Sequence, residues 1–260
     1  MTTLSVSRTG GDTAALVRRN LIRYQRRPDV ILLVLVQPLI LVLLFRYAIG
    51  GAIKIKGTSY VDYLMPGAFA LAIVNASATL GIGLAEDLTS GVVDRLRALP
   101  VARSAFLSAR VLTDVARNLL LIPLVGALGL AVGFHFHGTV ANVALAAALL
   151  LGLGFAFAWL SILLALWSGS VEATQGLSIL LFVLAGFVSS GFTPVSTMPS
   201  WLRGVAGASP VTHVDNALRI LTSSASGRVE HEVLAALLWM AAIVLVTVPL
   251  AVWRYSYYTQ

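Results

Sequence analysis

Long uncharged hydrophobic stretches alternate with short polar segments along most of this chain. Six of them have about the length that crosses ~30 Å of hydrocarbon at 1.5 Å per residue. The limits of the third to fifth are poorly defined, because residues 138–171 carry no charge and are too long for one straight span but too short for two. We predict six transmembrane helices, over residues 30–49, 64–85, 112–134, 139–166, 174–190 and 233–252.

The segment before the first span is basic and amphipathic. Five arginines between Arg18 and Arg27 alternate with apolar residues such as Leu21, a pattern typical of a helix that lies at the lipid headgroups. A cleaved signal peptide does not fit, because the following apolar run exceeds the ~7–15 residues of a signal core. The pattern divides the chain into an interfacial helix (1–29), a membrane domain (30–252) and a cytoplasmic tail (253–260).

The composition agrees with an all-α integral membrane protein. Hydrophobic residues make up 58% of the 260 residues and charged residues only 11%, whereas a soluble domain has about 25% charged residues. The absence of cysteine excludes disulfides and cysteine-based metal sites. The net charge of +7 is explained by membrane topology, so no nucleic acid partner is needed.

Basic residues predict the orientation of the spans. With the N-terminus inside the cell, the inner segments hold eleven basic residues and the outer segments five. The positive-inside rule therefore predicts a protein of the inner cell membrane with both termini in the cytoplasm. The inner set is Arg8, Arg18, Arg19, Arg23, Arg26, Arg27, Arg95, Arg97, Arg103, Arg110 and Arg254, and the outer set is Lys54, Lys56, Arg203, Arg219 and Arg228.

The longest inner segment contains "EDLTSGVVDRLRALP", residues 86–100, which carries five charges. On a helix, Leu88, Leu96 and Leu99 share an apolar face, while the charged residues face the other way. Pro100 ends this helix. Such an amphipathic elbow, parallel to the membrane, is either an inert connector or a lever moved by a soluble partner.

Residues 191–224 predict two short helices before the last span. Gly191 and Pro194 interrupt the fifth span, Pro199 is expected at the first position of one helix, capped by Ser196 or Thr197, and Pro210 at the first position of the next, capped by Ser209. On the second helix we expect an apolar stripe and an Asp215–Arg219 pair on its polar side. The stripe consists of Val211, Val214, Leu218 and Leu221. The hairpin would dip into the outer leaflet, as a gate for cargo or as a structural cap.

Three segments in this order resemble the ABC type-2 transporter permeases, the membrane subunits of ATP-driven exporters, and most closely the daunorubicin-resistance-type branch. They are "YLMPG" (63–67), "EDLTSGVVDRLRALPVARSAFLSARVLTD" (86–114) and "SSGFTPVSTMPSWLRGVAGASPVTHVDNALRIL" (189–221). The resemblance implies an exporter of a hydrophobic drug-like molecule or lipid that works by alternating access, and therefore a role in drug efflux and antibiotic resistance.

The same resemblance assigns sites and partners. It implies two copies of a separate ATPase subunit, which would bind ATP and Mg²⁺, and a second permease half that is identical or homologous. The residues expected to couple to the ATPase are Glu86, Asp87, Gly91, Asp94, Arg95, Leu96, Pro100 and Arg103, and those of the outer gate are Gly191, Pro194, Pro199, Trp201, Pro210, Asp215 and Arg219.

Other functions are less well supported by the residues. The chain has no Gly-Lys dipeptide and hence no phosphate-binding loop, so we expect no ATPase site, catalytic residue or cofactor in this chain. An ATP-independent secondary transporter would need ionisable groups at mid-membrane, but Asp114 and Arg117 are expected low in the third span, as a pair. For an intramembrane enzyme, no histidine lies within an apolar run. The deeper polar residues Gln37, Asn75, Asn118 and Ser161 are interpreted as contacts between helices.

Overall fold

The computed structural model describes residues 36, 38–49, 59–90, 103–223 and 227–258. Over these residues the regular structure is helical, without strands. An α-helix satisfies its own backbone hydrogen bonds, which a segment that crosses lipid must do. The N-terminal helix expected within residues 1–29 lies outside the described residues.

Among the described residues, four helices are long and apolar enough to cross a membrane. They are α3 (Tyr60–Thr89), α5 (Arg103–Ala131), α6 (Val140–Ser168) and α10 (Val229–Tyr258), and they coincide with the second, third, fourth and sixth predicted spans. The uncharged stretch 138–171 was expected to be too long for one span, but most of it forms the single helix α6. Its 29 residues extend about 43 Å, a length that a tilted helix accommodates.

Two shorter apolar helices occupy the places of the first and fifth predicted spans. One covers Pro38–Tyr47 and runs into a π-helical turn, η1 (Phe45–Ile49). The other, α7 (Val171–Phe187), begins after the left-handed residue Gly169 and is capped by Ser170, whose hydroxyl accepts a hydrogen bond from the Ala173 amide. It ends at Phe187, before the predicted limit at residue 190, so Gly191 and Pro194 do not end this helix as expected.

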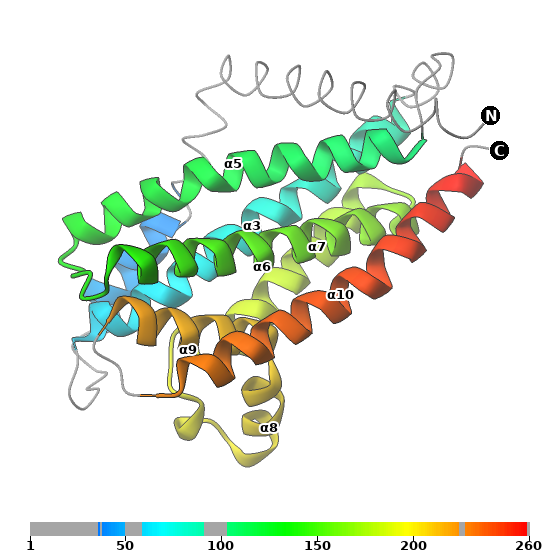
Figure 1. Cartoon of the computed structure of the whole chain (residues 1–260). Helices are drawn as coiled ribbons and strands as arrows, with labels where there is room; N and C mark the ends of the chain where they lie inside the picture. The colour runs from blue at the N-terminus through cyan, green and yellow to red at the C-terminus, as the bar shows by residue number, and fades with distance from the viewer. Residues whose placement is uncertain (1–35, 37, 50–58, 91–102, 224–226, 259–260) are drawn as a thin grey trace.

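The central helix of the bundle is α3, which packs against α5, α6, α7 and α9, while α10 packs against α6 and α9 (Figure 1). The C-terminal ends of α3, α6 and α10 lie at one end of the bundle, together with the starts of α5 and α7. The opposite end carries the α5–α6 connection and the short helices α8 and α9. The hairpin of α8 and α9 and the predicted elbow after α3 therefore lie at opposite ends of the bundle.

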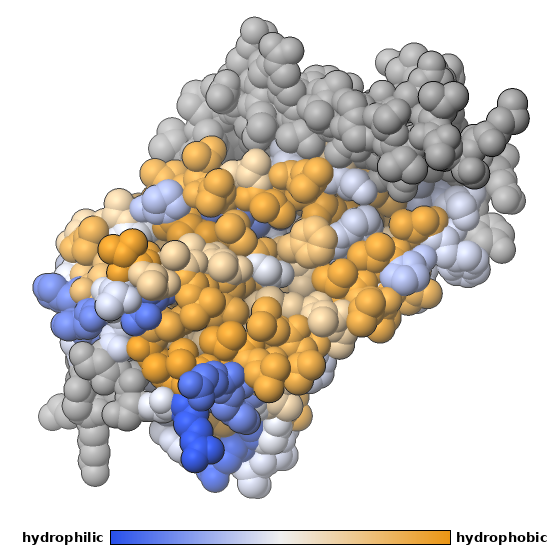
Figure 2. Space-filling view, viewed as in Figure 1, coloured by the Kyte–Doolittle hydropathy of each residue, from blue (hydrophilic) through white to orange (hydrophobic). Residues whose placement is uncertain are grey.

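The outer surface of the bundle is largely apolar. Figure 2 shows a broad hydrophobic surface, with hydrophilic residues gathered towards the end that carries the α5–α6 connection and the start of α10. Large exposed hydrophobic residues include Leu119 and Leu120 on α5 and Leu238 and Leu245 on α10. An exposed apolar area of this extent is suited to lipid contact and not to water.

The segment after α7 forms two short helices, α8 (Ser200–Ala208) and α9 (Pro210–Thr222), preceded by the 3₁₀ turn η2 (Val195–Thr197). Pro210 occupies the first position of α9 and Ser209 its N-cap, as predicted, although the Ser209 side chain makes no capping hydrogen bond. Pro199 was expected at the first position of α8 but is its N-cap, and no side chain caps this helix. The two predicted helices are therefore present, with a corrected start for α8.

Candidate functional site

Arg219 connects α9 to the start of α3 and to the turn that follows α7. It is 6% exposed, and its guanidinium donates hydrogen bonds to the Tyr63 carbonyl (3.1 Å), the Ser190 hydroxyl (2.8 Å) and the Gly191 carbonyl (3.3 Å). The Asn216 side chain accepts a further hydrogen bond. A rigid guanidinium with several donors is suited to such a junction, where a lysine could not reach all of these acceptors.

Tyr63 closes the same junction from α3. Its ring lies 3.9 Å from the centre of the Arg219 guanidinium, and its hydroxyl donates a 2.8 Å hydrogen bond to the Ser190 carbonyl. The Ser190 amide in turn donates to the Thr212 hydroxyl on α9. Three segments far apart in the sequence are thus held by one polar cluster, which we call the hairpin junction: Tyr63, Ser190, Gly191, Thr212, Asp215, Asn216 and Arg219.

Asp215 is the exceptional member of the hairpin junction. It is fully buried, and within the described part of the chain neither carboxyl oxygen has a hydrogen-bond partner. Arg219 lies one turn further along α9 but makes no ion pair with it among the described residues, because its donors are used by the carbonyls. Desolvation raises the pKa of Asp215 to about 7, and the Arg219 charge only partly lowers it.

The predicted Asp215–Arg219 ion pair is therefore not formed among the described residues, and its two side chains do not lie on an exposed face of α9. Asp215 and Arg219 were expected to pair on the polar face of α9, whereas both are buried and point into the bundle. The expected apolar stripe of α9 is confirmed, because Val211, Val214, Leu218 and Leu221 are all buried.

The remaining predicted gate residues lie at different depths. Gly191 is buried against Gly67 of α3, so two motifs far apart in the sequence meet at their glycines. Trp201 on α8 is 74% exposed. Pro194 precedes η2. Of the predicted gate residues, then, Gly191, Asp215 and Arg219 come together, and Trp201 does not join them.

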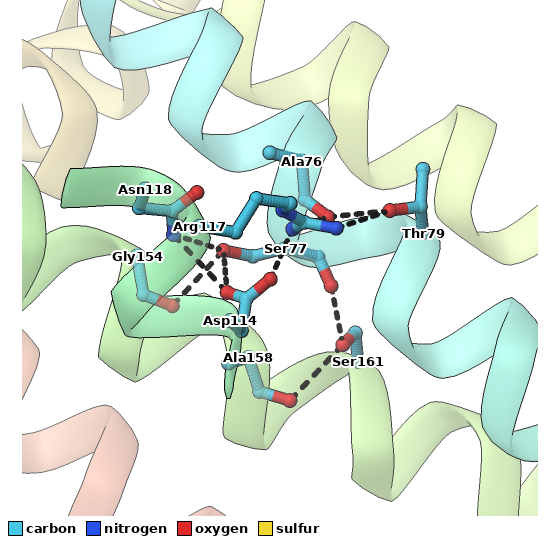
Figure 3. A network of polar contacts seen from close by, with 9 residues as sticks. All are labelled: Ala76, Ser77, Thr79, Asp114, Arg117, Asn118, Gly154, Ala158 and Ser161. Carbon is cyan, nitrogen blue, oxygen red and sulfur yellow. Dashed lines mark hydrogen bonds and ion pairs between the residues drawn. The ribbon is translucent and has the colours of Figure 1, made fainter. Parts of the chain in front are cut away.

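A second polar cluster, the mid-bundle network, joins α3, α5 and α6 (Figure 3). The fully buried Asp114 forms an ion pair with Arg117 and accepts hydrogen bonds from Ser77 (2.8 Å) and Asn118 (3.1 Å). The Ser161 hydroxyl donates to the Ser77 carbonyl. The predicted Asp114–Arg117 pair and the helix-contact roles of Asn118 and Ser161 are confirmed.

The depth of the mid-bundle network differs from the prediction. Ser77 also donates to the carbonyl of Gly154, which lies halfway along α6 (Val140–Ser168). The network is thus at the middle of the bundle and not low in the third span. Buried charges at such a depth are tolerated when they are paired and hydrogen-bonded, as they are here.

The described residues of the predicted coupling elbow lie at the end of the bundle opposite the α8–α9 hairpin, where α3 ends and α5 begins. Glu86 and Asp87 belong to the last turns of α3, which continues to Thr89, so the expected separate helix does not begin at Glu86. Asp87 forms an ion pair with Arg110 of α5, and Glu86 is exposed. Arg103 is the first residue of α5, while Gly91, Asp94, Arg95, Leu96 and Pro100 lie outside the described residues.

The histidines group at the end that carries the hairpin. His213 of α9 lies 2.7 Å from the Glu232 carboxylate of α10, and His231 lies 3.9 Å from the same carboxylate. In the ranges that the structure describes, no group of three or more histidine or acidic residues is arranged to hold a metal ion.

Comparison with known proteins adds the family. The sequence profile of the ABC-2 type transporters matches residues 12–222 of this chain. The chain belongs to the ABC-2 type transporter family. The match ends at the last residue of α9, so the hairpin junction and the mid-bundle network both fall inside the family domain.

Two relatives of this ABC-2 permease are drug-resistance proteins by name. The daunorubicin resistance ABC transporter permease protein DrrB1 of Streptomyces coeruleorubidus is 30% identical over 209 residues, which cover 80% of this chain and 74% of the relative. The probable doxorubicin resistance ABC transporter permease protein DrrC of Mycobacterium tuberculosis (strain CDC 1551 / Oshkosh) is 25% identical over 236 residues, covering 90% and 84%. The resemblance inferred from the sequence motifs is confirmed, and the chain is a multi-pass membrane permease.

The sequence motifs missed the connection between the two ends of the ABC-2 domain. Tyr63 was not singled out as a partner of Arg219, and Thr212 was not singled out as a partner of Ser190, although both lie in the segments that carry the resemblance. The role of Tyr63 depends on contacts with Ser190 and Arg219, 127 and 156 positions away, which no local pattern reports.

Proposed function

We propose that this chain is the permease subunit of an ATP-driven exporter that moves a hydrophobic, drug-like compound or a lipid out of the cell. The observation that carries the proposal is the ABC-2 family match over residues 12–222. The names of the two relatives, which refer to daunorubicin and doxorubicin resistance, support a drug-like cargo. The largely apolar bundle surface supports cargo that enters from lipid.

The proposed subunit works with two copies of an ABC ATPase, which bind ATP and Mg²⁺, and with a second permease half. Closed two-fold pairing of halves is the commonest assembly of this kind, and the second half is identical to this chain or homologous to it. We propose six spans, with the two shorter apolar helices as the first and fifth, and with both termini in the cytoplasm. Reporter fusions after Thr259 that are active only outside the cell would contradict this orientation.

Residues 86–100 are the proposed contact with the ATPase, and the α8–α9 hairpin is the proposed outer gate. The ion pair of Asp87 with Arg110 supports the first assignment, since it braces the end of α3 from which the elbow leaves. The hairpin junction supports the second, since it ties the hairpin to α3. ATP binding would move the elbow, and the long helices would carry the movement to the hairpin.

Export is tested with vesicles that contain this chain and a cognate ABC ATPase. A fluorescent anthracycline serves as the probe, and its transport is measured with ATP, with a non-hydrolysable analogue, and with an imposed proton gradient alone. We expect transport only with hydrolysable ATP. Transport driven by the gradient without ATP would instead favour a secondary transporter.

The elbow is tested separately by reversing one charge. Arg95→Glu should leave insertion intact but lower co-purification of the ATPase by a factor of roughly 30 or more, because a charge reversed at a buried contact costs about 2–5 kcal/mol. Drug-stimulated ATP hydrolysis should fall with it. Arg8→Glu near the N-terminus is the matched control and should do little. If Arg95→Glu changes neither property, the elbow is a connector.

A further inference from the structure

The fully buried Asp215 carboxyl has no hydrogen-bond partner among the described residues, although Arg219 is close to it in α9. Neither oxygen has a hydrogen-bond donor in the described part of the chain, and Arg219 directs its donors to the carbonyls of Tyr63 and Gly191. A Cβ atom on Gly191 would lie 3.2 Å from one Asp215 oxygen, so the turn after α7 packs directly over the carboxyl.

Burial of the carboxyl in this position favours its neutral form over the ionised carboxylate. An ionised carboxylate without donors loses its hydration and gains nothing in return, and such groups usually take up a proton instead. The raised pKa of Asp215, about 7, agrees with this geometry. In water the same side chain would have an ordinary pKa of about 3.9.

The other described charged groups on α9 and on the helices packed against it do not supply a partner for Asp215. On α9 itself, His213 is engaged with Glu232 of α10. On α3, Asp62 accepts from Ser59 at the surface, and Tyr60 and Tyr63 carry no charge at neutral pH. On α8, Arg203 donates to the carbonyls of Ser196 and Met198. The α6 sequence contains no charged residue, and the nearest influential charge is Arg219.

We propose that Asp215 is a proton-binding site: its carboxyl holds a proton while α9 is packed against α3 and the turn after α7, and releases it when the hairpin opens to water. On opening, the free carboxylate becomes the natural ion-pair partner of Arg219, which leaves the carbonyls of Ser190 and Gly191. The proton passes to water on opening, and the Asp215 carboxylate and the Arg219 guanidinium then neutralise each other in the open hairpin.

The direction of the pH effect follows from linkage. The packed state binds the proton more tightly than the open state, so between pH 4 and 7 packing takes up one proton and is weakened as the pH rises. Above about pH 7 both states are ionised and the effect becomes constant. The open fraction should therefore grow about tenfold per pH unit below pH 7 and then level off.

Cysteine labelling of the full chain measures this directly, because the chain has no cysteine of its own. Val214→Cys places a thiol at a fully buried position of α9, and Ser200→Cys places one at an exposed position of α8. The maleimide labelling rate of the first is divided by that of the second at each pH from 5 to 8, which removes the pH dependence of the thiol chemistry. Detergent micelles make both sides of the protein accessible, so the result depends neither on the topology nor on transport activity.

We expect the normalised rate to rise about 50-fold from pH 5 to 7 and to level off by pH 8. Asp215→Asn keeps the shape of the neutral acid and should make the rate low and independent of pH. His213→Gln is the matched control on α9 and should keep the native profile. A flat profile with Asp215 intact, a native profile in Asp215→Asn, or loss of the profile in His213→Gln would each overturn the proposal. If the unchanged chain shows the expected labelling profile but does not transport the anthracycline, the proposed export is wrong and the proposed proton site still stands.

Discussion

Gly67 of α3 and Gly191 of the turn after α7 are in backbone contact, and a Cβ atom on Gly67 would lie 2.5 Å from the Cα atom of Gly191. Because the obstacle is backbone and not the end of a side chain, Gly67→Ala must push the turn away from α3. Overpacking of this kind costs about 1–3 kcal/mol. We expect a lower melting temperature in detergent and faster labelling of Val214→Cys, since the hairpin junction is loosened.

Gly204→Ala on α8 is the control for this substitution. No atom of the described residues lies within 4 Å of a Cβ atom at that position, and replacing a helical glycine by alanine stabilises a helix by roughly 0.5–1 kcal/mol. Its melting temperature should stay the same or rise. Equal melting temperatures for Gly67→Ala and the unchanged chain would show that the close contact is not needed.

The geometry of the Arg219 guanidinium, and not only its charge, should hold the hairpin. Arg219→Lys keeps the charge but cannot donate simultaneously to the Tyr63, Ser190 and Gly191 carbonyls. Leaving such buried acceptors unpaired costs about 1–3 kcal/mol each. We expect limited proteolysis to cut near α8 and α9 in this variant, while α6 stays protected.

Arg203→Lys is the matched comparison, since Arg203 also donates to two carbonyls but is exposed on α8. Water can replace its hydrogen bonds, so its proteolysis pattern should stay that of the unchanged chain. If the protease cuts both variants equally, the buried hydrogen bonds of the Arg219 guanidinium do not hold the hairpin in place.

The Asp215–Arg219 pair shows where the sequence was informative and where it was not. At 100° per residue, Asp215 is about 40° from Val211 around the α9 axis, so it lies at the edge of the apolar stripe. Whether such an edge is buried depends on what packs beside it. The Gly67–Gly191 contact brings α3 and the turn close enough to cover it, and this contact is not visible in any local pattern.

The helices themselves were easier to predict than their depths. Hydrophobic length located four long helices to within a few residues at most ends, because lipid and backbone hydrogen bonding leave few alternatives. The exception was the start of α5, which the structure places at Arg103, nine residues before the predicted limit. That difference places Asp114 near the middle of the bundle and not at its base, because the predicted span left out the first nine residues of the helix.

The mid-bundle network allows a test of how paired buried charges act. Asp114→Leu alone leaves Arg117 without its ion-pair partner and should lower stability by about 3–5 kcal/mol, whereas Asp114→Leu with Arg117→Met should recover most of the loss. The free energy of unfolding in mixed micelles measures both variants, with Asp62→Asn as a surface control. Additive losses in the double variant would mean that each side chain acts through its other contacts, such as those of Asp114 with Ser77 and Asn118.

The Asp87–Arg110 ion pair should matter for the transfer of movement more than for folding. It joins the last turn of α3 to α5 near the start of the proposed elbow, and its side chains are 30% and 14% exposed, so the pair is screened and contributes modestly to stability. Arg110→Asp places two like charges there and should separate the two helix ends. We expect near-normal insertion but reduced drug-stimulated ATP hydrolysis with the ATPase present. The exchanged pair, Asp87→Arg with Arg110→Asp, restores opposite charges and should recover stimulation. Because Arg110 also lies over the Phe106 ring at 4.9 Å, an exchanged pair that stays inactive would assign the effect to that ring contact and reject the ion pair as the brace.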